Sequence, residues 1–243
     1  MSLNHPQYKA QGEKLKMSDL RLRRQTSAVT RFTDDDRWMD LRGTRDGSMI
    51  SADWLTAMAL EGRCYGVNTG VDTSPDTFTA AYDATKPDLL VTVPSGTTII
   101  PVFIQINMED TGTADIMDWV AVASSVYDAA YTGTACTIYN MRMDAPHASL
   151  CTCAAVISAN GSTPLAGNFI EFWRGNAGFN ADAFNGNTTP TSELVTRTAW
   201  NVKDSLVPPV IVGQGSLNVY ASCQAGLGFI TAIWVEVPST SIQ

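Results

Sequence analysis

The stretch DLLVTVPSGTTIIPVFIQIN, residues 88–107, decides the fold class, because it joins two runs of β-forming residues through a turn. Residues 89–93 read as one strand. Residues 94–96, Pro-Ser-Gly, supply turn chemistry, with proline early and glycine late. The next strand starts at Thr97 and contains Pro101, which has no backbone N–H to donate to a sheet. We therefore expect Pro101 at a sheet edge, at a β-bulge, or where a strand crosses between sheets.

Much of the remaining chain has the same two-residue period. The candidate strands are 64–69, 88–93, 98–108, 117–127, 134–143, 149–158, 168–173, 206–212, 215–223 and 229–237. In SLNVYAS, for example, Leu217, Val219 and Ala221 share one face. Pro208 and Pro209 interrupt a later β-forming run in the same way as Pro101. About eight to ten strands separated by turns, with no helix among them, predict an all-β fold: an antiparallel jelly-roll or Greek-key β-sandwich.

The N-terminal part is different in character, so we expect two regions: an arm over residues 1–62 and the sandwich over residues 63–243. The arm is predicted to contain two short helices. Thr33 would cap the first, with three aspartates in its first turn and Gly43 at its end. The second would span residues 51–61, capped by Ser51 and ended by Gly62.

Charge is distributed unevenly along the chain. The formal net charge is −8, but residues 1–45 hold 10 Lys and Arg against 6 acids, a net of +4, which leaves −12 for residues 46–243. A basic arm of this kind favours contact with a neighbouring copy, with nucleic acid, or with an anionic internal membrane. The candidate arm contacts are Lys14, Lys16, Arg21, Arg23, Arg24 and Arg31.

The sequence contains no motif that predicts a metal or a cofactor. Cys151 and Cys153 share a strand face near His147, but a zinc site needs a fourth ligand and the Cys-x-x-Cys spacing is absent. We expect these thiols to be buried in the core. With five cysteines and no secretory signal at residues 1–16, we expect the chain to be made in a reducing cytoplasm.

No catalytic residue is predicted either. The acidic residues Glu109, Asp110, Asp115 and Asp118 flank a polar loop, and solvation explains them as well as glycoside hydrolysis would. Residues 174–192 form the longest stretch without a period, so we expect a loop there. Its two phenylalanines, Phe179 and Phe184, are candidate contacts with a partner.

Three stretches resemble the single jelly-roll coat proteins of icosahedral viruses, in particular those of bacteriophages. They are VPSGTTIIPVFIQIN at 93–107, PPVIVGQGSLNVY at 208–220 and FITAIWVEVP at 229–238, and the resemblance covers residues 64–238. TNF-like trimers and carbohydrate-binding modules share these patterns.

The resemblance implies a structural virion protein whose copies build an icosahedral shell through sandwich contacts and an exchanged arm. Its partners would be copies of itself and other virion proteins. A low charged fraction of 16% suits large contact surfaces. Two alternatives stay open: a receptor- or sugar-binding virion module with exposed aromatic residues such as Trp173, and a hydrolase that uses Asp115, Asp118 or Glu171.

Overall fold

The computed structural model describes residues 21–25, 36–40, 53–71, 74–79, 81–111, 115–127, 130–144, 147–179, 197–205, 207–222 and 225–241. It divides into one unit that ends at Ala52 and a second that runs from Asp53 to Ile242. Arm residues 53–62 of the predicted division fall in the second unit.

In the first unit, β1 (Arg21–Gln25) pairs antiparallel with β2 (Asp36–Asp40). The helix predicted from Thr33 is therefore wrong over β2. The antiparallel pairing supplies ladder hydrogen bonds between the two segments, with Arg21 in register with Asp40, which the capping pattern did not include.

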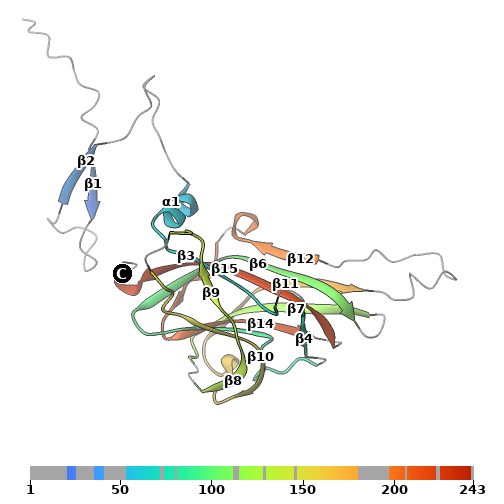
Figure 1. The fold of residues 1–243 in the computed structure, drawn as a ribbon. Helices are drawn as coiled ribbons and strands as arrows, with labels where there is room; N and C mark the ends of the chain where they lie inside the picture. Colours follow the sequence, from blue (N-terminus) through green and yellow to red (C-terminus); the bar gives the residue numbers. More distant parts are fainter. Residues whose placement is uncertain are drawn as a thin grey trace, which may run out of the picture. The chain divides into compact units, whose positions relative to one another are not determined.

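The second unit consists of two antiparallel sheets stacked as a sandwich (Figure 1). The six-stranded sheet runs, in spatial order, β11 (Phe169–Phe179), β7 (Asp115–Ser124), β14 (Gly215–Ser222), β5 (Leu89–Val93), β10 (Thr152–Asn160) and β8 (Tyr131–Ala135). The seven-stranded sheet runs β12 (Arg197–Asn201), β6 (Thr97–Thr111), β15 (Gly226–Pro238), β3 (Cys64–Asn68) and β9 (Ile138–Asn140), with β13 (Ile211–Val212) beside β6 and β4 (Asp76–Phe78) beside β15. The all-β prediction is confirmed at the level of an antiparallel sandwich.

Helical structure in the second unit is short. Helix α1 (Trp54–Leu60) precedes β3, and in the described part of this unit 3-10 turns span Pro164–Ala166, Val202–Asp204 and Ser239–Ser241. The helix starts three residues later than predicted: its N-cap is Asp53, whose side chain makes no capping hydrogen bond, and not Ser51. It ends where predicted, because Gly62 takes a positive φ of 70°.

The turn at residues 94–96 carries the chain from one sheet to the other, from β5 to β6. The Thr97 N–H donates to the Pro94 carbonyl over 3.3 Å, and Gly96 supplies a φ of 82°. Pro101 faces β15 where the register shifts, opposite Trp234, and lies between the stretches of β6 that pair with β13 and with β12. Of the three places expected for this proline, the structure has the β-bulge, because the register between β6 and β15 shifts there.

The core lies between the two sheets. Trp119 and Phe78 meet edge to face, with ring centroids 4.9 Å apart, and both are buried. Leu217, Val219 and Ala221 of β14 face this core, as their alternation predicted. The two-residue period therefore places the apolar side chains of the central strands correctly.

The outer side of the six-stranded sheet is also covered, which alternation did not predict. The Tyr220 hydroxyl donates to the Ala84 carbonyl over 3.1 Å. The Asp88 carboxylate, 1% exposed, accepts bonds from the N–H of Thr79 (2.8 Å) and the N–H of Ala221 (2.7 Å). Asp88 thereby fastens the segment before β5 to the central strand β14.

Several predicted elements have different bounds in the structure. The strand predicted at 134–143 is two strands in different sheets, because the chain leaves β8 after Ala135 and joins β3 as β9. The strand predicted at 206–212 is reduced to β13, since its prolines cannot donate ladder bonds. The loop predicted at 174–192 is strand up to Phe179, because β11 pairs with β7 along its whole length. The short strands β4 and β12 were not predicted.

Replacing Trp119 by alanine should lower the free energy of unfolding by about 3–5 kcal/mol, because it removes a fully buried ring and leaves a cavity. Chemical denaturation checks this value. Met143→Ala is the matched control: this side chain is 97% exposed, so the change should stay within about 0.5 kcal/mol. Equal effects of the two substitutions would contradict the core assignment.

Asp88 should make stability depend on pH. Burial raises the pKa of this carboxyl above its usual range, although its hydrogen bonds oppose the shift. The folded protein then binds the proton more tightly than the unfolded chain does, so protonation of Asp88 stabilises the folded state. This contribution to the unfolding free energy is complete below the unfolded pKa of about 4. It is lost as pH rises through the raised folded pKa. Unfolding free energies measured across pH should show wild type losing stability relative to Asp88→Asn as pH rises; the opposite trend would mean that the hydrogen bonds to the Asp88 carboxylate outweigh desolvation.

Candidate functional site

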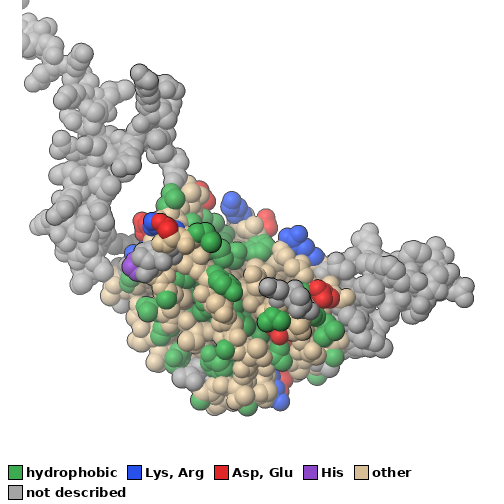
Figure 2. All heavy atoms as spheres, in the orientation of Figure 1, with side chains coloured by type: hydrophobic (Ala, Val, Ile, Leu, Met, Phe, Trp, Pro, Cys, Tyr) green, Lys and Arg blue, Asp and Glu red, His purple; other side chains and the backbone are tan. Residues whose placement is uncertain are grey.

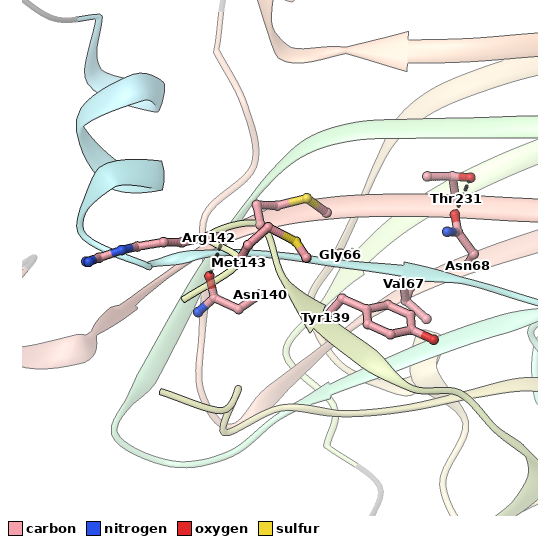
Figure 3. Close-up of a pocket in the computed structure, with 9 residues that line it drawn as sticks. Gly66, Val67, Asn68, Tyr139, Asn140, Arg142, Met143 and Thr231 are labelled. Carbon is pink, nitrogen blue, oxygen red and sulfur yellow. Dashed lines mark hydrogen bonds between the residues drawn. The ribbon is translucent and has the colours of Figure 1, made fainter. Parts of the chain in front are cut away.

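A hollow on the seven-stranded sheet lies beside β9 (Figure 3). It has a volume of about 530 Å³ and its floor is the backbone of Gly66 and Val67. Tyr139, Met141 and Met143 form its apolar wall; we call these three residues the β9 patch. The polar rim consists of Asn68, Asn140, Arg142 and Thr231.

Hydrogen bonds around Asn140 hold the wall in place. Its side-chain amide donates to the carbonyl of Gly62 (2.8 Å) and to that of His147 (3.2 Å), and its amide oxygen accepts from the N–H of Arg142 (2.9 Å). Arg142 also donates to the carbonyl of Leu60 over 3.0 Å, at the end of α1. The patch lies on β9 and the residues directly after it, and this segment is therefore tied to the end of α1 and the turn that follows α1.

The patch is apolar and open to solvent. Met143 is 97% exposed and Tyr139 is 56% exposed. Met141 covers Gly66 so closely that a Cβ there would lie 2.1 Å from its terminal methyl carbon. Methionine side chains adapt to irregular partners, so this wall suits contact with another surface.

A second apolar hollow, of about 290 Å³, lies at the start of β11. Phe169, Ile170, Val210 and Val212, which we call the β11 patch, line it and are each about half exposed or more. β11 ends the six-stranded sheet and lies beside β12, whereas β9 ends the seven-stranded sheet on the other side. The two patches are therefore at opposite lateral edges of the sandwich.

Charged groups near these patches are paired and exposed. The Arg142 guanidinium bonds the Asp144 carboxylate over 2.6 Å and lowers the pKa of that carboxyl. Glu171 pairs likewise with Arg174, which lowers the pKa of Glu171. In the face that Figure 2 shows, the described residues carry scattered hydrophobic side chains and few charged ones. Such a surface favours packing over binding of a highly charged ligand.

The structure places the predicted contact residues only in part. Arg21, Arg23 and Arg24 lie on β1, while Lys14, Lys16 and Arg31 fall outside the described residues. Phe179 ends β11 and Phe184 falls outside the described residues. Whether they contact partners stays a prediction.

The thiols and carboxylates weighed for chemistry are separated or paired. Cys151 and Cys153 are buried, as expected, and within the described ranges no three His, Cys, Asp or Glu side chains gather to hold a metal. Glu171 lies opposite Val122 on β7, four residues from Asp118, which is about 13 Å along a strand. Glycoside hydrolysis uses carboxylates about 5–10 Å apart, so these two do not form such a pair.

Comparisons with protein-family models, with curated proteins and with solved structures found no match. In the described part of the chain, no helix has the length and apolar character needed to span a membrane.

Sequence reasoning missed both patches. The signal for the β9 patch was the order Tyr139, Met141, Met143, with large apolar side chains at alternate positions of a polar stretch. Alternation of this kind predicts a strand with one apolar face, but it does not tell whether that face is buried or open. The patch is exposed because β9 is the last strand of its sheet, and the sequence does not show that position.

Asn140→Ala should release the end of α1 from β9, because it removes three hydrogen bonds at once. We expect a loss of about 1–3 kcal/mol in unfolding free energy and faster amide exchange at residues 60–63. Hydrogen exchange with mass spectrometry measures the local effect. Thr137→Ala, at an exposed neighbouring position, should change neither the unfolding free energy nor the amide exchange at residues 60–63. Effects as large as those of Asn140→Ala would refute the anchoring role of Asn140.

Proposed function

We propose that this sandwich is a jelly roll. Support comes from four strand pairs: β3 with β15, β5 with β14, β6 with β12, and β7 with β11. In chain order these eight strands join first to eighth, second to seventh, third to sixth and fourth to fifth. Successive pairs alternate between the two sheets. One long antiparallel hairpin wrapped around a core produces this nested order, which is the topology of a jelly roll.

Three further strands, β8, β9 and β10, come between the fourth and fifth strands of this order. β10 and β8 extend the six-stranded sheet beyond β5, and β9 extends the other sheet beyond β3. The insertion thus widens both sheets at the same edge. It also supplies the wall of the β9 patch.

On this fold we propose a structural role: a virion coat subunit that packs side by side with copies of itself into a shell. Fold alone does not decide function, since jelly rolls also occur in lectins and cupins. The observation that carries the proposal is the pair of apolar patches at opposite edges. Each patch groups several exposed apolar side chains, whereas single exposed apolar side chains are normal on protein surfaces. The two patches are made of different residues.

Different patches at opposite edges favour head-to-tail contact. When the β11 patch of one copy meets the β9 patch of the next, the first copy keeps its β9 patch free and the second keeps its β11 patch free. Contacts of this heterologous type build rings or extended arrays, whereas a self-complementary patch stops at a dimer. The basic N-terminal segment, of net charge +4 against an acidic body, favours a further contact with a neighbour, and an internal membrane or the genome are its alternative partners.

A second candidate function is sugar binding at Tyr139. This exposed ring stands between the hollow of the β9 patch and a more polar hollow lined by Ser74, Asp76, Thr134 and Thr137. An aromatic face beside hydroxyl and carboxylate groups suits a sugar ring. Binding on a glycan array that Tyr139→Ala abolishes, by a protein that stays monomeric, would favour this candidate.

Introducing one negative charge into each of the two patches tests the shell proposal. Met143→Asp and Ile170→Asp should each stop assembly of the full chain, because each places a carboxylate in an apolar contact. An equal mixture of the two variants should form dimers and nothing larger, since each variant keeps the patch that the other has lost. Light scattering and negative-stain images measure the species.

Ala225→Asp is the matched control. It adds the same charge at an exposed position between β14 and β15, both of which lie inside their sheets, and should assemble like wild type. A mixture that contains only monomers would contradict the head-to-tail contact. Wild-type chain that stays monomeric at every concentration and salt would contradict assembly by the chain alone.

A further inference from the structure

Two cysteines face each other where β8 leaves the six-stranded sheet. The register pairs Ala135 with Ala154, so the next opposed pair is Cys136 and Cys153, and the Cys136 N–H donates to the Cys153 carbonyl over 3.0 Å. Opposed residues of such a hydrogen-bonded pair have Cα atoms about 5.5 Å apart and side chains on one face. A disulfide spans Cα separations of about 4.4–6.8 Å. The backbone therefore already holds these two thiols at a separation that a disulfide can bridge.

The two thiols differ in access. Cys153 is 4% exposed and belongs to the core, whereas Cys136 is half-buried. Cys136 lines the hollow of about 620 Å³ that also contains Asp76 and Thr134. A small reagent that enters this hollow meets the Cys136 sulfur first.

We propose that Cys136 is a redox-active thiol and Cys153 its resolving partner, so that a small-molecule disulfide converts the pair into an intrachain disulfide. This proposal goes beyond the coat function and does not depend on it. Nothing in the candidate site uses either thiol. The remaining described cysteines, Cys64 and Cys151, are both buried.

The electrostatic environment agrees with this division of roles. A hydrogen bond with Cys153 lowers the pKa of the Cys136 thiol, and burial raises the pKa of the Cys153 thiol. Burial also raises the pKa of Cys64 and of Cys151. The thiolate is the nucleophile, so Cys136 should react first among the described cysteines.

The reaction has two exchange steps. The Cys136 thiolate attacks one sulfur of the reagent, the reagent's S–S bond breaks, and one small thiolate leaves, which gives a mixed disulfide on Cys136. Cys153 then loses its proton and attacks the Cys136 sulfur, and the second small thiolate leaves. In total the protein dithiol is oxidised and one small disulfide is reduced to two thiols. The second step is the slower one, because the Cys153 sulfur is buried and protonated.

The new bond would fix the edge of the sandwich that carries the β9 patch. Cys136 lies in the two-residue link between β8 and β9, and Cys153 lies on β10. The closed loop contains Tyr139, Met141 and Met143. Oxidation should therefore stabilise this edge after the chain leaves a reducing compartment, while the reduced form stays compatible with synthesis in one.

Oxidised glutathione is the probe that tests the proposal, applied to the full chain with Cys223→Ser, because the Cys223 side chain lies outside the described residues. Intact mass should show the loss of two hydrogens, peptide mapping should place the bond between Cys136 and Cys153, and the Tm should rise. Cys153→Ser should stop at one glutathione on Cys136. Cys136→Ser should react at least about tenfold more slowly, because its remaining thiols are buried. Cys151→Ser is the matched control and should behave like the parent.

Glutathione on Cys64 or Cys151 before Cys136 would overturn the proposal, as would a parent chain that stops at the mixed disulfide. Should Cys153→Ser fail to fold, brief alkylation of the parent followed by peptide mapping gives the same decision. Cys136 alkylated first supports the proposal, and uniform labelling of all thiols refutes it.

Discussion

The antiparallel ladder between β6 and β15 is the constraint on which the rest of the sandwich depends. These are the longest strands described, 15 and 13 residues, and they pair from Thr97–Pro238 at one end to Thr111–Gly226 at the other. The ladder joins an early strand to the last one, and the chain between them supplies β9, β12, β13 and every strand of the six-stranded sheet except β5. Closing a loop of this length costs entropy that local contacts cannot offset, and the core around Trp234 and Ile104 supplies the compensation.

The ladder also explains why Pro101 is tolerated in the centre of a sheet. A proline inside a regular central strand would leave a neighbour's carbonyl without a donor. Here β15 shifts register at Ile233 and Trp234, and the opposite edge of β6 changes partner from β13 to β12.

The sequence predicts the central strands well and the edges poorly, for a physical reason. Strands such as β5, β14 and β15 bury apolar side chains, and burial imposes a two-residue period that can be read directly. β12 and β13 are held by backbone bonds to β6, which leave no signature in side-chain type. Likewise, residues Arg174–Phe179, which show no two-residue period, continue β11 because β7 lies alongside. Functional surfaces at edges are therefore the part of a β-sandwich least visible in a sequence.

The insertion of β8, β9 and β10 links the two features that distinguish this sandwich. A jelly roll of eight strands would end at β3 and β5 on this side, with unpaired edges that invite uncontrolled pairing. The insertion covers those edges by pairing β10 with β5 and β9 with β3, and it carries the apolar wall of Tyr139, Met141 and Met143. It also places Cys136 against Cys153 at the junction of the two sheets. A covalent bond at that junction would hold the wall in a fixed position. Because an apolar contact gains specificity when its surface is preorganised, the thiol pair and the β9 patch can act on the same interface without sharing any residue.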